Sequence, residues 1–239
     1  MPGIYQWGDA GPRILLVHGL SSSAESWWRV VEDLAPHARL TAIDLRGHGA
    51  SGAADDYSLE SYASDLPRED WDAVVAHSLG GAAAVVAASR SGFARSLVLL
   101  DPVLEVAPGE FAEVMADQVD ELGLDEASIA TAKPHWHERD RAAKLAGVRS
   151  VVPDAVSRTF TDSGAWNVVT EARSLAVPTL IVAGDPDVYT MLDPGLARSL
   201  AEENPLIEYR VIPGAGHSPH RDVPDATLAA LRERVLPQV

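Results

Sequence analysis

The chain of 239 residues contains no cysteine. This absence excludes disulfides, a thiolate metal site and a cysteine nucleophile. The sequence also lacks an apolar run of the roughly 20 residues that cross a bilayer. Its first residues show no basic segment followed by an apolar one, so no signal peptide is expected.

Basic residues are scarce, because 19 Lys and Arg stand against 35 Asp and Glu, which gives a formal net charge of −16. A field of this sign repels nucleic acid and anionic membrane surfaces. The charge predicts no nucleic-acid and no membrane partner, and the missing signal peptide and bilayer-spanning run predict a cytoplasmic protein. A small-molecule substrate is the expected partner, although the charge does not identify it. The composition leaves the oligomeric state open.

Hydrophobic residues make up 46% of the chain, which is enough for one substantial core. Short apolar runs alternate with segments of helical spacing. This rhythm predicts an α/β fold with a mostly parallel central sheet flanked by helices. The expected strands are Ile4–Trp7, Arg13–Val17, Leu40–Asp44, Asp72–Ala76, Ser96–Asp101, Val177–Gly184 and Leu206–Ile212.

One serine lies where an apolar run turns into a helix of small residues. Ser78 follows the strand that ends at Ala76, and the helix begins at about Leu79. A sharp strand-to-helix turn lifts such a hydroxyl out of the sheet and strains its backbone. The N–H of Leu79 lies at the start of the helix, where free donors and the helix dipole favour negative charge. Ser78 is therefore a candidate nucleophile.

The segment Ala76-His77-Ser78-Leu79-Gly80 resembles the G-x-S-x-G nucleophile elbow of the α/β-hydrolase family, with alanine in place of the first glycine. Asp44 to Ser51 matches the family pattern D-x-R-G-H-G-x-S at every specified position. The resemblance implies a hydrolase core over residues 1–102 and 176–239, with a helical cap over residues 103–175, inserted after the strand that ends at Asp101. It implies architectural roles for Asp44, Arg46 and His48, and also for His18.

The resemblance also implies the other catalytic residues. G-x-G-H at residues 214–217 matches the loop of the catalytic histidine, so His217 is the expected base, and His220 is the competing candidate, expected to be exposed. G-x-x-D at residues 184–187 makes Asp187 the expected acid, with Asp185 and Asp101 as alternatives. The N–H groups of Leu20 and Leu79 are expected to form the oxyanion hole.

Within the cap, Trp136 and Trp166 are candidate pocket walls, and Trp136, Ser21 and Val188 are expected to contact the substrate. His135 and His137 lack nearby carboxylates or cysteines at ligand spacing, so neither a metal nor a cofactor is expected.

The order Ser78, Asp187, His217 is that of α/β hydrolases. It favours a serine esterase or lactonase acting through an acyl-enzyme. A carbon–carbon bond hydrolase, a cofactor-free haloperoxidase or perhydrolase, and a non-catalytic ligand-binding protein stay open as alternatives.

Overall fold

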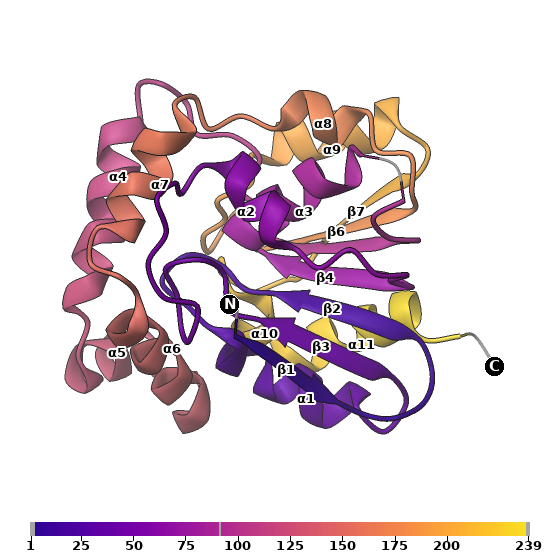
Figure 1. The fold of residues 1–239 in the computed structure, drawn as a ribbon, viewed down its shortest axis with the longest axis horizontal. Helices are drawn as coiled ribbons and strands as arrows, with labels where there is room; N and C mark the ends of the chain where they lie inside the picture. The colour runs from indigo at the N-terminus through magenta and orange to yellow at the C-terminus, as the bar shows by residue number, and fades with distance from the viewer. Residues whose placement is uncertain (1–2, 91, 238–239) are drawn as a thin grey trace.

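A seven-stranded sheet forms the centre of the molecule (Figure 1), in a computed structural model that describes residues 3–90 and 92–237. The strand order is β1-β3-β2-β4-β5-β6-β7, and every neighbouring pair is parallel except β1 with β3. This confirms the expected mostly parallel α/β sheet. The strands are β1 (Ile4–Trp7), β2 (Arg13–Val17), β3 (Arg39–Ile43), β4 (Ala73–His77), β5 (Leu97–Leu100), β6 (Thr179–Ala183) and β7 (Ile207–Val211).

Helices cover both faces of the sheet (Figure 1). One face carries α2 (Leu59–Asp65), α3 (Leu79–Ala88), α8 (Val169–Arg173) and α9 (Pro194–Glu203). The other carries the 3-10 helix η1 (Ala24–Trp27), α1 (Trp28–Leu34), α10 (Pro219–Asp222) and α11 (Pro224–Val235). No helix of the described residues is both long and apolar enough to span a bilayer.

The core lies on both faces of the sheet, which explains why the strand sequences are continuously apolar. In β2, Leu15 and Val17 pack toward the alanines of α3, whereas Ile14 and Leu16 pack toward Trp27 and the helices of the other face. Successive strand residues point to opposite faces, so a strand covered on both sides shows no polar alternation.

The first strand is the one that departs from the parallel pattern. β1 pairs antiparallel with β3 at the edge of the sheet, with Ile4 opposite Ile43. The described residues contain no further strand before β2, as expected from the short N-terminal segment. Met1 and Pro2, like Ser91, Gln238 and Val239, lie outside the described residues.

A helical insertion separates β5 from β6, where the cap was expected. It comprises α4 (Phe111–Asp120), the 3-10 helix η2 (Glu121–Gly123), α5 (Glu126–Ala132), α6 (Glu138–Ser150), α7 (Ala155–Ser163) and α8. Helices α4 to α7 lie together at one end of the sheet (Figure 1), whereas α8 packs against α3 and α9 of the core. The division into a core and a cap over residues 103–175 stays a prediction.

Candidate active site

Ser78 lies in a strained turn between β4 and α3. Its φ is +54°, a value that side chains other than glycine seldom adopt. Backbones pass closely at this turn, and glycine permits the approach. A Cβ added to Gly80 would lie 2.5 Å from the carbonyl oxygen of His18. A Cβ on Gly19 would lie 2.9 Å from the Cβ of Ser78. The two glycines therefore let the loop after β2 approach the serine, and strain of this kind clusters at functional sites.

His217 connects the serine to a carboxylate. Its Nε2 lies 2.9 Å from Ser78 Oγ, and its Nδ1 lies 2.5 Å from Asp101 Oδ2. The carboxylate accepts a hydrogen bond from Nδ1–H, so Nε2 is the nitrogen with a free lone pair toward the serine hydroxyl. The arrangement can remove a proton from Ser78 as its oxygen attacks an electrophile.

Asp101 is the carboxylate that contacts His217, although it was the alternative and not the first choice from the sequence. It follows β5 directly, has φ +40° and is completely buried. Its Oδ1 accepts bonds from Gly184 N–H at 3.1 Å and the Thr190 hydroxyl at 2.5 Å. Its Oδ2 accepts from Met191 N–H at 2.9 Å as well as from His217. These bonds satisfy a buried carboxylate and fix its orientation toward the imidazole.

Asp187, the expected acid, does not contact His217, and this expectation is corrected. Asp187 is exposed in the turn after β6, and its N–H donates to Asp185 Oδ1 at 3.0 Å. Asp185 also accepts from Gly214 N–H at 2.8 Å, and the hydrogen bonds from Gly214 and Asp187 lower the pKa of its carboxyl. The turn therefore supports the histidine loop from outside, while Asp101 contacts the imidazole.

Two backbone N–H groups lie where an oxyanion hole was expected. Leu79 is the first residue of α3, so its N–H is among the donors that have no acceptor within the helix. Leu20 follows Gly19 in the loop after β2, and both leucines line the same cavity as Ser78. Among the described residues, no acceptor is assigned to either N–H group. Their assignment as the oxyanion hole stays a prediction.

The polar residues of the D-x-R-G-H-G-x-S segment hold neighbouring loops together, as expected. Asp44 accepts from the N–H groups of Ala24 and Ala50, both at 2.8 Å. Arg46 binds both carboxylate oxygens of Asp65 at 2.6 Å.

Two buried imidazoles fix the loop that carries Leu20. The Nε2 atom of His48 accepts from Ser21 N–H at 3.2 Å, and that of His18 accepts from Leu45 N–H at 3.0 Å. Burial lowers the pKa of His18 to about 4 and that of His48 to about 3, so both rings stay neutral and act as acceptors.

These imidazoles predict that acid destabilises the protein. An unfolded histidine takes up a proton near pH 6.5, whereas the folded rings resist until about pH 4 (His18) and about pH 3 (His48). The unfolded state therefore binds more protons below pH 6.5, and the free energy of unfolding falls by up to about 1.4 kcal/mol per pH unit and per ring. Urea unfolding at about pH 7 and about pH 5 measures the loss, which we expect to reach about 2 kcal/mol for each ring. A His48→Gln variant should show a smaller loss, and equal stability of the wild type at both pH values would contradict the prediction.

Two further histidines adjoin the site, and the sequence reasoning missed one and misplaced the other. His77 donates from Nε2 to the carbonyl of His217 at 2.8 Å and so holds the histidine loop. His220 is buried, with 3% of its surface exposed, which corrects the expected exposure. It packs between Trp27 and His77, with ring centroids 5.1 Å and 4.9 Å away. Its ring nitrogens have no partner within the part of the chain described, so it does not compete with His217 for Ser78.

The cavity at Ser78 is small and mostly apolar. Its volume is about 20 Å³, room for about one water molecule. The insertion provides its roof through Val114, Gln118, Phe160 and Trp166, and the indole N–H of Trp166 donates to Val103 O at 2.8 Å. The remaining lining residues are Leu20, Leu79, Val103, Val106, Met191 and His217.

Three expected pocket residues do not line this cavity. Trp136 is buried in the insertion, and its indole N–H donates to Asp222 at 2.7 Å. Val188 is 56% exposed beside Asp187. Ser21 is fully buried next to Leu20 and is not among the lining residues. The place of Trp136 depends on how the insertion packs on the core, which local sequence does not encode.

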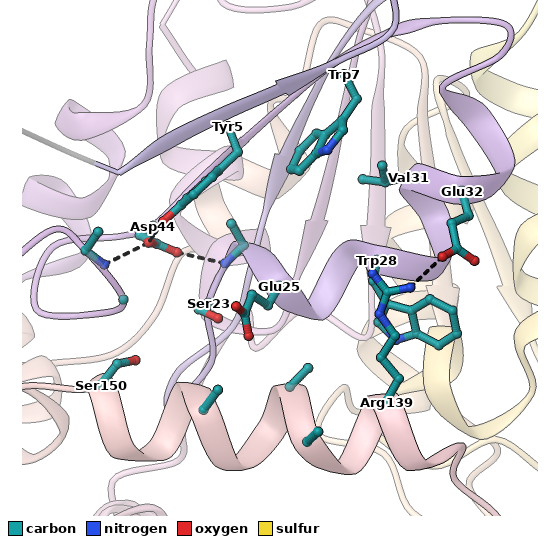
Figure 2. Close-up of a pocket in the computed structure, with 16 residues that line it drawn as sticks. Tyr5, Trp7, Ser23, Glu25, Trp28, Val31, Glu32, Asp44, Arg139 and Ser150 are labelled. Atoms are coloured by element: carbon teal, nitrogen blue, oxygen red, sulfur yellow. Dashed lines mark hydrogen bonds and ion pairs between the residues drawn. The ribbon is translucent and has the colours of Figure 1, made fainter.

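A second, larger cavity of about 910 Å³ lies between α6, the η1–α1 segment and β1 (Figure 2). Tyr5, Trp7 and Trp28 form its aromatic walls, and Arg139 pairs with Glu32 at 2.5 Å. It shares no lining residue with the cavity at Ser78. Asp44 also lines this cavity. Its carboxylate accepts hydrogen bonds from the Tyr5 hydroxyl and from the N–H groups of Ala24 and Ala50, and so holds neighbouring loops together.

The histidines beside Trp136 have partners other than a metal. His135 lies 3.0 Å from Asp222, and His137 caps α6 by accepting from Arg139 N–H at 3.1 Å. Residues 3–90 and 92–237 contain no group of three or more His, Cys, Asp or Glu side chains placed to hold an ion.

Comparisons with known proteins agree with the observed fold. A family model described as the alpha/beta hydrolase family matches residues 14–231. Lipase LipV of Mycobacterium tuberculosis is 32% identical over 148 residues, which are 57% of this chain and 56% of the lipase. The match thus spans little more than half of the lipase's length.

Two further proteins match along nearly their whole length. N-formylmaleamate deformylase of Pseudomonas putida is 26% identical over 243 aligned positions, covering 94% of this chain and 89% of the deformylase. The crystal structure of E-2-(acetamidomethylene)succinate hydrolase superposes with a TM-score of 0.82 at 23% identity, over 97% of this chain and 94% of the other. At this identity the superposition shows the shared fold.

Proposed function

Because the chain belongs to the alpha/beta hydrolase family, we propose that it is a serine hydrolase that cleaves a small to mid-sized apolar carboxylic ester or lactone. The matching relatives are themselves hydrolases, which supports hydrolase activity in general. The observation that carries the serine mechanism is the continuous hydrogen-bonded series from Ser78 through His217 to Asp101, at 2.9 and 2.5 Å.

The reaction proceeds in two steps through an acyl-enzyme. His217 takes the proton of Ser78 as the Oγ atom attacks the carbonyl carbon, and then gives it to the leaving alcohol. Asp101 holds the imidazole tautomer and stabilises the imidazolium. The N–H groups of Leu20 and Leu79 receive the oxygen that gains charge, a contribution of about 3–4 kcal/mol for each donor. Water activated by His217 then releases the acid.

The lining of the cavity supports an apolar group next to the reacting carbonyl. Phe160, Trp166 and Val114 face Ser78 from the insertion. The described cavity holds about one water molecule, so an acyl group enters only when this roof moves outward. The names of two similar proteins, for N-formylmaleamate and for 2-(acetamidomethylene)succinate, describe amides that carry carboxylates. A substrate of this chain with a carboxylate beyond the reacting group is consistent with them.

A burst experiment with p-nitrophenyl esters of graded acyl length tests the proposal. Because acylation releases the phenol before deacylation, we expect a burst that approaches one equivalent per active site, followed by slower turnover. The preferred acyl length measures the space available when the roof opens. Ester turnover without a burst would mean that acylation is slower than deacylation, and single-turnover mass spectrometry then detects the acyl-enzyme directly.

The outcome that contradicts the proposal is a folded protein that neither turns over esters and lactones nor forms an acyl-enzyme. That result would favour the non-catalytic ligand-binding alternative.

A further inference from the structure

Arg221 is a buried cation without a carboxylate partner. The residue follows the catalytic histidine by four positions on α10, and only 4% of its surface is exposed. Among the described residues, no carboxylate lies within ion-pair distance of its guanidinium, and its Nε has no hydrogen-bond acceptor. Its contacts are Ser22 Oγ at 3.3 Å and the face of Trp136, with the ring centroid 5.0 Å away. A buried charge is costly unless it is paired, so Arg221 is available to pair with an anion that binds beside it.

The nearby carboxylates are engaged elsewhere. Asp140 binds the indole N–H of Trp28 at 2.7 Å and the guanidinium of Arg29 at 2.8 Å. Asp222 binds the indole of Trp136 and also accepts from Gly216 N–H at 3.0 Å. Burial lowers the pKa of the Arg221 guanidinium, and the charges of Asp140 and Asp222 oppose that shift without bonding to it.

A second buried cation and two hydroxyls share this region. Lys144 of α6 is 9% exposed, and one turn further Gly147 packs directly on the Ser21–Ser22 segment, where an added Cβ would lie 2.7 Å from Ser22 Cα. Residues three apart on a helix share a face, so Lys144 lies above the same segment. The Ser21 hydroxyl is fully buried and unpartnered among the described residues, and the φ of Ser21 is +52°. Arg221 Nε and Ser21 Oγ are thus two buried polar groups with unused hydrogen-bonding capacity.

The cap supplies one carboxylate to this region. Glu121, in η2, binds the ammonium of Lys144 at 2.5 Å. Burial opposes its ionisation, but Lys144 outweighs that effect, with His217 and Arg221 acting in the same sense, and the pKa of Glu121 is lowered. Glu121 is therefore an anion held near Lys144, Arg221 and the catalytic histidine at once.

This region adjoins the cavity at Ser78 from two sides. Ser21 follows Leu20, which lines the cavity. Glu121 follows Gln118 by three residues, and Gln118 lines the cavity from α4. Leu20 and Gln118 thus connect this region along the chain to the wall of the cavity at Ser78.

We propose that Arg221 and Lys144, with the hydroxyls of Ser21 and Ser22, form a subsite for a carboxylate of the substrate. In the free enzyme the Glu121 carboxylate pairs with Lys144 of this subsite. The inference rests on the proposed ester hydrolysis at Ser78 and names the substrate class as esters that carry a second, ionised carboxyl group. Binding exchanges one carboxylate for another, so the cap segment with Glu121 moves away as the substrate enters. No covalent step is added.

A matched pair of esters tests the subsite. One is p-nitrophenyl hydrogen adipate, and the other is its neutral isostere, in which an isopropyl group replaces the carboxylate. The readout is the ratio of kcat/KM for the charged ester to that for the neutral one. Loss of a buried charged contact in Arg221→Met should lower this ratio by at least about 30-fold, mainly through KM, and Arg221→Lys should restore part of it. An unchanged ratio in folded Arg221→Met would overturn the proposal and leave Arg221 as a structural contact of Trp136.

The cap residues provide tests that do not depend on folding of the Arg221 variant. Lys144→Met should also lower the ratio, whereas Arg149→Met, which removes an exposed charge from the same helix, should leave it within about twofold. Glu121→Gln removes the competing anion and should raise the ratio by about fivefold or more, because the substrate carboxylate no longer has to displace Glu121 from Lys144. A lower ratio in Glu121→Gln would contradict the assigned role of Glu121.

Binding of adipate to the Ser78→Ala variant separates the subsite from the proposed function. Calorimetry should detect adipate, and Arg221→Met should weaken its binding by at least about 30-fold. Binding through Arg221 without ester turnover by the wild type would keep the subsite and reject the serine hydrolase. Ester turnover with no adipate binding and an unchanged ratio would keep the hydrolase and reject the subsite. Inorganic phosphate binding as tightly as adipate would contradict selectivity for a carboxylate.

Discussion

Ser78→Ala is expected to lower kcat for ester hydrolysis by about 10⁴- to 10⁶-fold. The variant removes the Oγ atom that lies 2.9 Å from His217 Nε2 and is the proposed nucleophile. Alanine is smaller than serine and fits the same crowded turn, so the fold and the affinity for product acids should persist. The measurement is steady-state hydrolysis of the ester that the wild type prefers, with circular dichroism to verify folding.

The matched control for this variant is Ser89→Ala. Ser89 ends the same helix α3 at its far end, where its hydroxyl donates to Val86 O at 2.8 Å. Its activity should match the wild type. If Ser78→Ala kept hydrolysis within tenfold of the wild type, Ser78 would lose its role as nucleophile.

Asp101→Asn is expected to lower kcat by about 10⁴-fold, because an amide can donate to Nδ1 and so favours the wrong imidazole tautomer. The side chain keeps its shape, and its oxygen can still accept from Gly184 or Met191. Asp187→Asn is the paired variant. Asp187 is exposed and its side chain does not bond to His217, so its activity should stay within about twofold.

The comparison of the two variants decides between the two loops. Both proteins must show a thermal transition near that of the wild type, because Asp101 also ties β5 to Gly184 and Thr190. A larger loss in Asp187→Asn than in Asp101→Asn would reverse the assignment made from the geometry.

Local patterns were enough to predict most of the fold. The run Arg13–Val17 is β2 as expected, because residues buried on both faces of a parallel sheet are continuously apolar. The helix expected over residues 57–66 begins at Leu59, since the hydroxyl of Ser58 accepts from Ser61 N–H at 3.3 Å. Short-range propensity and capping determine such elements, so the sequence reveals them.

The site was predicted only where one short segment determines it. Ser78 and His217 each belong to a motif whose glycines dictate the local turn, and the structure brings the two together. The acid belongs to no such segment. Asp101 and Asp187 both follow strands that end at the same edge of the sheet, and the choice depends on donors 83 to 116 residues away from Asp101, such as Gly184 and His217.

The cavity at Ser78 was the least predictable part, for the same reason. Its roof comes from α4, α7 and Trp166, whose positions depend on packing of the insertion against the core. Trp136 instead packs under Arg221 and binds Asp222. An aromatic residue in a helical insertion carries no local signal of which cavity it faces.

The most direct test of the account is labelling with a small fluorophosphonate, followed by peptide mass spectrometry. The account predicts one adduct per chain on the peptide that contains Ser78, formed at a rate that falls sharply in Asp101→Asn and is unaffected in Asp187→Asn. A folded protein that hydrolyses esters yet carries its adduct on another residue, or that reacts equally fast in Asp101→Asn, would contradict the roles given to Ser78, His217 and Asp101.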